Sequence, residues 1–264
     1  MTDVTAGVFI SYLGRRVRLK WHKLRRDRAD PPFGLANLRA GLAAGASLEI
    51  DIRALADGAF VCLHDDVLDG ETDGHGRVGE ADTAAIRGLR ISGTAYAPPL
   101  LSDIARELAA APNSSACLQL DLKEKREGLS LSAIEAFVAT IGPVAQSCLL
   151  SGTDWHAVEA LGAAVPSLRL GFDPLDLAKG RDLADRAAIA AFLEEVAATA
   201  PGAAGFYLNY RFVLRALAHG INPVPRLQQG GALVDIWTLD PTTPEICDVL
   251  EPILATGADQ ITTN

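Results

Sequence analysis

Short apolar runs alternate along this chain with segments whose apolar residues recur at helical spacing. Eight of the runs predict strands, at residues 16–22, 47–52, 116–123, 147–151, 168–172, 205–209, 232–238 and 259–263. Helical spacing is clearest over residues 35–44, 130–142, 153–164 and 242–257. Strands that alternate with helices are typical of a parallel α/β fold, and eight of them predict one closed (β/α)8 barrel over residues 1–264. An open, doubly wound sheet is the alternative.

Residues at the ends of these segments refine the predicted elements. Asp57-Gly58 follows the second strand, so the run at 59–64 is expected to form a small hairpin with that strand. Ser130 is placed to cap the helix at 130–142. Thr242 and Glu245 have the spacing of a capping box. Pro252 is expected to kink or split the last helix.

Composition is that of an ordinary globular protein, with 264 residues and 49% hydrophobic content, which is enough for a large core. No run of eighteen apolar residues predicts a membrane span. The first sixteen residues are acidic before they are basic, the reverse of a secretory signal, so we expect a cytoplasmic protein. The cysteines lack zinc-site spacing and are expected to be reduced core residues. They are Cys62, Cys117, Cys148 and Cys247.

Charge is distributed unevenly along the chain. Residues 15–28 hold eight basic side chains and one acid, whereas the whole chain carries −9. Such a run is usually a solvated face, and its functional interpretation is attraction of an anionic substrate or a lipid head group. It is the one feature that favours contact with a membrane surface. The acidic remainder and the lack of a binding motif argue against nucleic acid as a partner.

Two acids in the second predicted strand are the most informative feature of the chain. Glu49 and Asp51 are two residues apart, so both side chains point to the same face of the strand. Burying carboxylates costs free energy unless their charge is compensated. A divalent cation that takes oxygen ligands would compensate it. His64 follows the next apolar run and can transfer protons near pH 7. In a barrel, chemistry is expected at the carboxyl ends of the strands, where further polar candidates fall: His22, Asp121, Lys123 and Trp237.

Together these motifs resemble the glycerophosphodiester phosphodiesterase family of metal-dependent TIM barrels. The family carries His-Arg-Gly, Glu-x-Asp, His-Asp, Glu-x-Lys and Trp-Thr in this order. The corresponding residues here are His22-Lys23-Leu24, Glu49-Ile50-Asp51, His64-Asp65, Asp121-Leu122-Lys123 and Trp237-Thr238. Residues 68–80, 98–103 and 257–263 are also similar to family segments, so the resemblance extends over nearly the whole chain.

The chain departs from the family pattern at three places. Lys23-Leu24 replaces Arg-Gly, Asp121 replaces a glutamate, and residues 31–34 replace a Pro-Glu-Asn-Thr segment. Lysine is a point charge where arginine would bind phosphate through a planar fork. The Asp-x-Lys motif is also similar to the sphingomyelinase D barrels of spider toxins. Those barrels lack the long segment that separates His64 from Asp121 here, so this likeness ranks second.

The predicted function is hydrolysis of glycerophosphodiesters to glycerol phosphate and an alcohol. One divalent cation, Mg²⁺ or Ca²⁺ with Mn²⁺ as a third candidate, is expected on Glu49, Asp51 and Asp121. Two histidines are expected to act as acid and base, in an order left open, and the resemblance implies that three further residues contact the substrate. These five residues are His22, His64, Lys23, Lys123 and Trp237. The alternatives are lysophospholipase D-like or sphingomyelinase D-like activity on lipid head groups, and a degenerate barrel that binds phosphodiesters without turnover.

Overall fold

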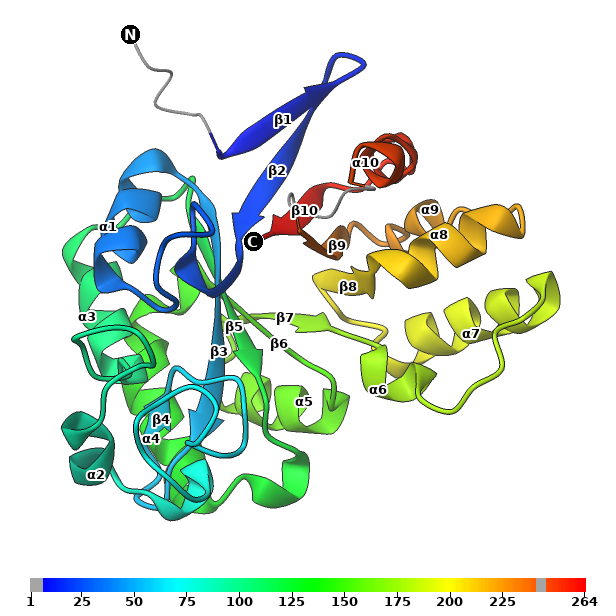
Figure 1. Ribbon diagram of the computed structural model, residues 1–264. Helices are drawn as coiled ribbons and strands as arrows, with labels where there is room; N and C mark the ends of the chain where they lie inside the picture. Colours follow the sequence, from blue (N-terminus) through cyan, green and yellow to red (C-terminus); the bar gives the residue numbers. More distant parts are fainter. Residues whose placement is uncertain (1–6, 241–245) are drawn as a thin grey trace, which may run out of the picture.

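A closed ring of eight parallel strands forms the centre of the computed structural model, which describes residues 7–240 and 246–264 (Figure 1). The ring closes where β2 pairs with β10 on one side and with β3 on the other, with Lys20 opposite Ser47. This closure confirms the predicted barrel and excludes the open sheet. In chain order the ring strands are β2 (Arg15–Trp21), β3 (Ser47–Ala54), β5 (Cys117–Leu122), β6 (Cys148–Gly152), β7 (Arg169–Phe172), β8 (Gly205–Asn209), β9 (Leu233–Leu239) and β10 (Gln260–Thr263).

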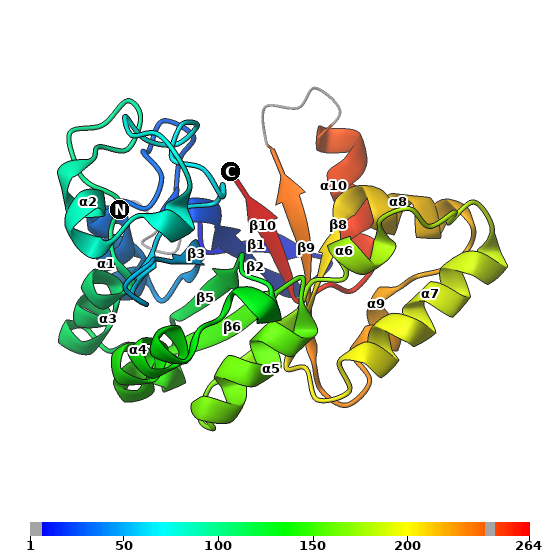
Figure 2. The same cartoon turned by 90° about the horizontal axis from the view of Figure 1, so that it is seen from below.

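Helices surround the ring on its outer side (Figure 2). The longer ones are α1 (Leu35–Ala44), α3 (Leu101–Ala110), α4 (Leu131–Ile141), α5 (Trp155–Ala164), α7 (Arg186–Thr199), α8 (Tyr210–Ala218) and α10 (Ile246–Ala255). The shorter ones are α2 (Thr83–Gly88), α6 (Leu175–Ala178), α9 (Val224–Leu227) and the 3-10 turns η1 (His22–Leu24), η2 (Val78–Glu80), η3 (Arg126–Gly128) and η4 (Gly142–Ser147). Within the described ranges, none of these helices combines the length and apolar character needed to cross a bilayer.

Helix ends follow the local rules in most places. The Ser130 hydroxyl accepts the Ala133 amide at 3.1 Å, as predicted for the start of α4. The predicted capping pair, Thr242 and Glu245, lies outside the described residues. Pro252 was expected to kink or split the last helix, and it does not split it, because α10 continues through Pro252. Burial of the side chains that follow Pro252 holds this turn against the barrel.

Two additional strands lie outside the ring. β4 (Phe60–Val61) pairs antiparallel with β3, with Arg53 opposite Val61, which confirms the predicted hairpin. β1 (Phe9–Tyr12) pairs antiparallel with β2 and was not predicted. The Arg16 guanidinium lies 3.8 Å from the centre of the Phe9 ring, a cation–π contact that joins these two strands.

The basic residues of segment 15–28 are distributed over different parts of the barrel. Arg15 donates to the Gly257 carbonyl at 2.8 Å, and Arg18 donates to the Gly45 carbonyl at 2.8 Å. Both carbonyls precede ring strands, so these two arginines serve the amino-terminal end of the barrel. Lys20 instead lies inside the ring and is 2% exposed. These three residues of the segment therefore do not belong to one exposed basic face.

The inside of the ring is more polar than the branched apolar core usual for this architecture. Its buried polar side chains include Lys20, Gln119, Ser151, Asp235, Gln260 and Thr262. Tyr207 also lies inside, and Gly171 makes room for its ring. A Cβ atom at Gly171 would lie 2.6 Å from Tyr207 Cε2, so any larger residue there would have to displace the Tyr207 ring. The apolar core lies between the ring and the helices.

Candidate active site

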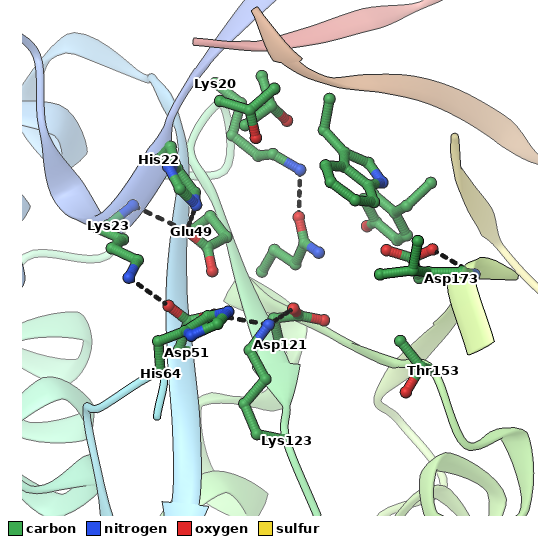
Figure 3. A pocket seen from close by; sticks show the side chains of 16 residues that line it. Lys20, His22, Lys23, Glu49, Asp51, His64, Asp121, Lys123, Thr153 and Asp173 are labelled. Atoms are coloured by element: carbon green, nitrogen blue, oxygen red, sulfur yellow. Dashed lines mark hydrogen bonds and ion pairs between the residues drawn. The ribbon is translucent and has the colours of Figure 1, made fainter. Parts of the chain in front are cut away.

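A cavity of about 280 Å³ opens at the carboxyl ends of the strands (Figure 3). Its lining includes every site residue predicted from the sequence, namely His22, Lys23, Glu49, Asp51, His64, Asp121, Lys123 and Trp237. The side chains come from β3, β5 and β9 and from the segments that follow β2, β4 and β5. Closure of the ring thus brings together residues that are up to about two hundred positions apart in the sequence.

Three carboxylates converge on one side of this cavity. Glu49 and Asp51 are 3% and 1% exposed, and Asp51 is in register with Asp121 on the neighbouring strand. One oxygen from each of the three carboxylates lies within 4.8 Å of the others. The two acids of β3 lie inside the strand and not at its end as expected, because β3 extends to Ala54 to form the hairpin.

Two ammonium groups offset part of this negative charge. Lys123 Nζ lies 2.8 Å from Asp51 Oδ1 and 2.5 Å from Asp121 Oδ2. Lys23 Nζ lies 3.5 Å from Asp51 Oδ2. Burial favours the neutral form of Asp51, but the two lysines outweigh it and lower its pKa to about 2. Burial, followed by the charges of Asp51 and Asp121, raises the pKa of Glu49 well above its usual value.

The arrangement of donors fits a hard divalent cation. Asp51 Oδ2 is buried and accepts no hydrogen bond from the described residues. Glu49 Oε2 accepts one, from the Lys23 amide at 2.8 Å. Carboxylate oxygens without nitrogen or sulfur donors match Mg²⁺ or Ca²⁺ better than zinc. A cation would also relieve the repulsion that raises the pKa of Glu49, so these residues could hold such an ion.

His22 begins the turn that follows β2 and points toward the carboxylates (Figure 3). Its Nδ1 atom lies 2.6 Å from Asn264 Oδ1, and its Nε2 atom lies 3.9 Å from Glu49 Oε2. Since an amide oxygen only accepts, Nδ1 carries the proton and Nε2 is left as an acceptor. Burial lowers the pKa of His22, partly opposed by Asp51 and by the bond to Asn264. Asn264 was not predicted to belong to the site.

His64 lines the same cavity and is half exposed (Figure 3). Its Nδ1 atom lies 2.8 Å from Asp65 Oδ1, so Asp65 orients the ring. The amides of His64 and Asp65 donate to Glu71 Oε2 at 2.6 and 2.9 Å. Glu71 Oε1 also lies 3.3 Å from Lys23 Nζ. Glu71 therefore links the backbone of His64 and Asp65 to Lys23. This role was not predicted, although Glu71 lies in the segment 68–80 that is similar to the family.

The turn that carries Lys23 has an unusual backbone. Lys23 and Leu24 have φ angles of 54° and 60°, in the left-handed region that side chains other than glycine seldom adopt. Three contacts offset this strain. The Lys23 amide donates to Glu49, its carbonyl accepts the Phe33 amide at 2.8 Å, and the Leu24 side chain is fully buried. Leucine in place of the family's glycine is thus accommodated at a backbone cost of about 1–3 kcal/mol.

Asp173 lies on the far side of the cavity, away from the three carboxylates (Figure 3). It is 9% exposed, and its Oδ1 atom accepts the Leu175 amide at 2.9 Å. Burial, followed by the charge of Asp121, raises the pKa of Asp173 to about 8. Trp237 lines the same cavity, and its buried Nε1 atom has no hydrogen-bond partner among the described residues. Asp173 was not predicted as a site residue, although it directly follows the predicted strand 168–172.

Polar residues inside the ring form the floor of the cavity. Lys20, Gln119 and Thr262 reach its lining from below the carboxylates. None of these three residues was predicted to belong to the site. A signal was present, because Lys20 precedes His22 by two residues and Gln119 precedes Asp121 by two. Residues two apart on a strand share a face, so these side chains had to point into the ring as well.

Comparison with known proteins provides an independent view of this site. A model of the "Glycerophosphoryl diester phosphodiesterase family" matches residues 34–264. Among curated proteins, none matches the sequence. The family match covers all of the predicted site residues except those of the first turn, His22 and Lys23.

Several solved structures share the fold. A candidate glycerophosphoryl diester phosphodiesterase from Silicibacter pomeroyi superposes with a TM-score of 0.73 at 20% identity, covering 94% of this chain and 89% of that one. A phosphodiesterase from Oleispira antarctica, solved with the product sn-glycerol-3-phosphate, superposes with a TM-score of 0.68 at 21% identity. The match covers 93% of this chain and 92% of that one. A glycerophosphodiester phosphodiesterase from Agrobacterium tumefaciens superposes with a TM-score of 0.66 at 19% identity. The match covers 94% of this chain and 96% of that one. At these identities the likeness establishes the barrel fold.

Proposed function

This chain belongs to the glycerophosphoryl diester phosphodiesterase family, and from that premise we propose that it hydrolyses small glycerophosphodiesters to glycerol phosphate and an alcohol. The observation that carries the proposal is the convergence of three carboxylates, two histidines and two lysines on one cavity. The product bound in the Oleispira antarctica relative supports a substrate of this size and chemistry.

Glu49, Asp51 and Asp121 would hold one divalent cation, Mg²⁺ or Ca²⁺. Such an ion supplies Lewis-acid stabilisation of the charge that develops on phosphate oxygens. Lys123 and Lys23 lie beside Asp51, one of the same carboxylates, and would bring positive charge to a phosphate bound there. Preorganised charges of this kind are among the largest contributions that a protein makes to transition-state stabilisation.

The two histidines line the cavity together with the carboxylates and would move the protons. The lowered pKa of His22 keeps its imidazole neutral at pH 7, and the bond to Asn264 leaves Nε2 free to accept a proton. His22 is therefore the general base for the attacking hydroxyl or water. His64, held by Asp65, is the general acid that protonates the leaving alcohol. Each transfer typically contributes about 10²–10⁴ in rate.

The proposal is tested by incubating the purified chain with glycerophosphocholine and glycerophosphoethanolamine in the presence of Mg²⁺, Ca²⁺ or Mn²⁺. We expect release of the free alcohol that depends on the metal and is abolished by EDTA. His22→Ala and His64→Ala should each reduce kcat by at least about 10². His75→Ala is the matched control, because His75 is an exposed histidine outside the cavity.

Full activity in either cavity variant would contradict the two-histidine mechanism. Absence of turnover on every diester, with metal binding intact, would favour the degenerate binding barrel instead.

A further inference from the structure

Four strands contribute buried polar side chains to one continuous chain of hydrogen bonds beneath the carboxylates. Lys20 Nζ lies 2.7 Å from Asp235 Oδ2 and also donates to Gln119 Oε1. Gln119 Nε2 donates to Ser151 Oγ at 2.7 Å, and Ser151 Oγ donates to Asp121 Oδ1 at 2.8 Å. This chain, called the interior relay below, thus runs from Asp235 on β9 through β2, β5 and β6 to the carboxylate of Asp121.

The chemistry of its members fixes the direction of the interior relay. Lys20 carries only donors, so it must face the amide oxygen of Gln119. The amide nitrogen of Gln119 then faces Ser151 and donates to a lone pair of the Ser151 hydroxyl oxygen. The hydroxyl proton of Ser151 is therefore directed at Asp121, which as a carboxylate only accepts. Reversing any one link would leave two donors or two acceptors facing each other.

Burial makes the interior relay costly to break and rigid when intact. Lys20 and Gln119 are 2% and 6% exposed, and Ser151 and Asp235 are fully buried. Lys20 is further held by the Tyr207 ring, whose centre lies 4.5 Å from Nζ, and Asp235 accepts the Thr262 hydroxyl at 2.7 Å. Buried polar networks with every member satisfied hold their side chains in one arrangement.

We propose that Lys20, Gln119 and Ser151 are positioning residues that fix the Asp121 carboxylate for cation binding, with Asp235 as the counter-charge that anchors them. The Ser151 hydroxyl ties Oδ1 of Asp121, while Oδ2 lies toward Lys123 Nζ at 2.5 Å. Groups that hydrogen-bond a metal ligand set its orientation, and their loss typically weakens metal binding by about 10- to 100-fold. This inference rests on the cation site of the proposed function.

Isothermal titration calorimetry of Mg²⁺, and separately of Ca²⁺, into the EDTA-stripped full-length chain tests the proposal. Ser151→Ala removes the last link, and we expect the Kd for the ion to rise by about 10- to 100-fold. Gln119→Leu removes the link before it and should weaken binding in the same direction. Because the links act in series, the double variant should bind no more weakly than Ser151→Ala alone.

Ser130→Ala is the matched control, because it also removes a serine hydrogen bond, at the start of α4 and outside the cavity. Its Kd should equal that of the wild-type chain. Circular dichroism verifies that each variant is folded before titration. An unchanged Kd in folded Ser151→Ala, or strictly additive effects in the double variant, would overturn the interior relay while the cation site itself stands. A wild-type chain that binds neither ion would overturn the cation site as well.

Discussion

The buried carboxyl of Asp173 makes a specific prediction about stability and pH. Its pKa in the folded chain is about 8, against 3.8 for the unperturbed group. Between these two pH values the folded chain keeps a proton that the unfolded chain has released. Folding stability must therefore fall as the pH rises through this window. The isosteric change Asp173→Asn removes the titrating group and keeps an oxygen to accept the Leu175 amide.

The size of the effect follows from the shift. A difference of about four pKa units, at about 1.4 kcal/mol per unit, sets an upper limit of roughly 6 kcal/mol. Any rearrangement that hydrates the carboxylate reduces this value. We therefore expect the free energy of unfolding of the wild type to fall by several kcal/mol as the pH rises through this window. Near pH 4 the folded wild-type Asp173 is protonated and resembles asparagine, while the unfolded group is only at about its titration midpoint. Little of the pH-dependent loss of stability has developed at this pH, so the two proteins should have similar stability there.

Urea denaturation at pH 4.5 and at pH 9, in EDTA, measures the effect. The free energy of unfolding of Asp173→Asn minus that of the wild type should increase by several kcal/mol between the two pH values. Asp182→Asn, at an exposed aspartate of the same region, is the control and should show no such increase. A difference between Asp173→Asn and the wild type that stays constant with pH would refute the reasoning.

Two further substitutions test how side chains are placed in the cavity. Asn264→Ala frees the ring of His22 and should lower kcat about tenfold or more. The bond to Asn264 raises the pKa of His22, so its loss should also move the acidic limb of the kcat/KM profile to lower pH. An unchanged profile would contradict the pairing. Gly171→Ala forces a Cβ atom against Tyr207 and should destabilise the fold by about 1–3 kcal/mol, measured by urea denaturation. Unchanged stability would show that the Tyr207 ring can move aside.

The ring strands were predictable from the sequence because each is a short apolar run between turn residues. The bounds of the helix at Leu35–Ala44 were predicted without error, since Gly45 ends it in the left-handed conformation. The helix at Arg186–Thr199 was missed. Alanine occupies all of its faces, so its hydrophobic and polar sides differ little. β1 was missed because four residues give too little alternation to identify a strand.

Site residues were predictable where alternation along one strand or a family motif identified them. Glu49 and Asp51 belong to this group. Glu71 and Asn264 approach the histidines from a loop and from the end of the chain, and no local spacing encodes those contacts. Links across the ring, such as that between Lys20 and Asp235, depend on how the ring closes and are visible only in three dimensions.

The central claim is that the carboxylates of the cavity hold the divalent ion on which hydrolysis depends. The most direct measurement pairs calorimetric titration of Mg²⁺ and Ca²⁺ with hydrolysis of glycerophosphoethanolamine, in the wild-type chain and in Glu49→Gln/Asp51→Asn. The account predicts one binding site and metal-dependent turnover in the wild type, and loss of both in the folded double variant. A double variant that binds the ion as tightly as the wild type, or that hydrolyses the diester at the same rate, would contradict it.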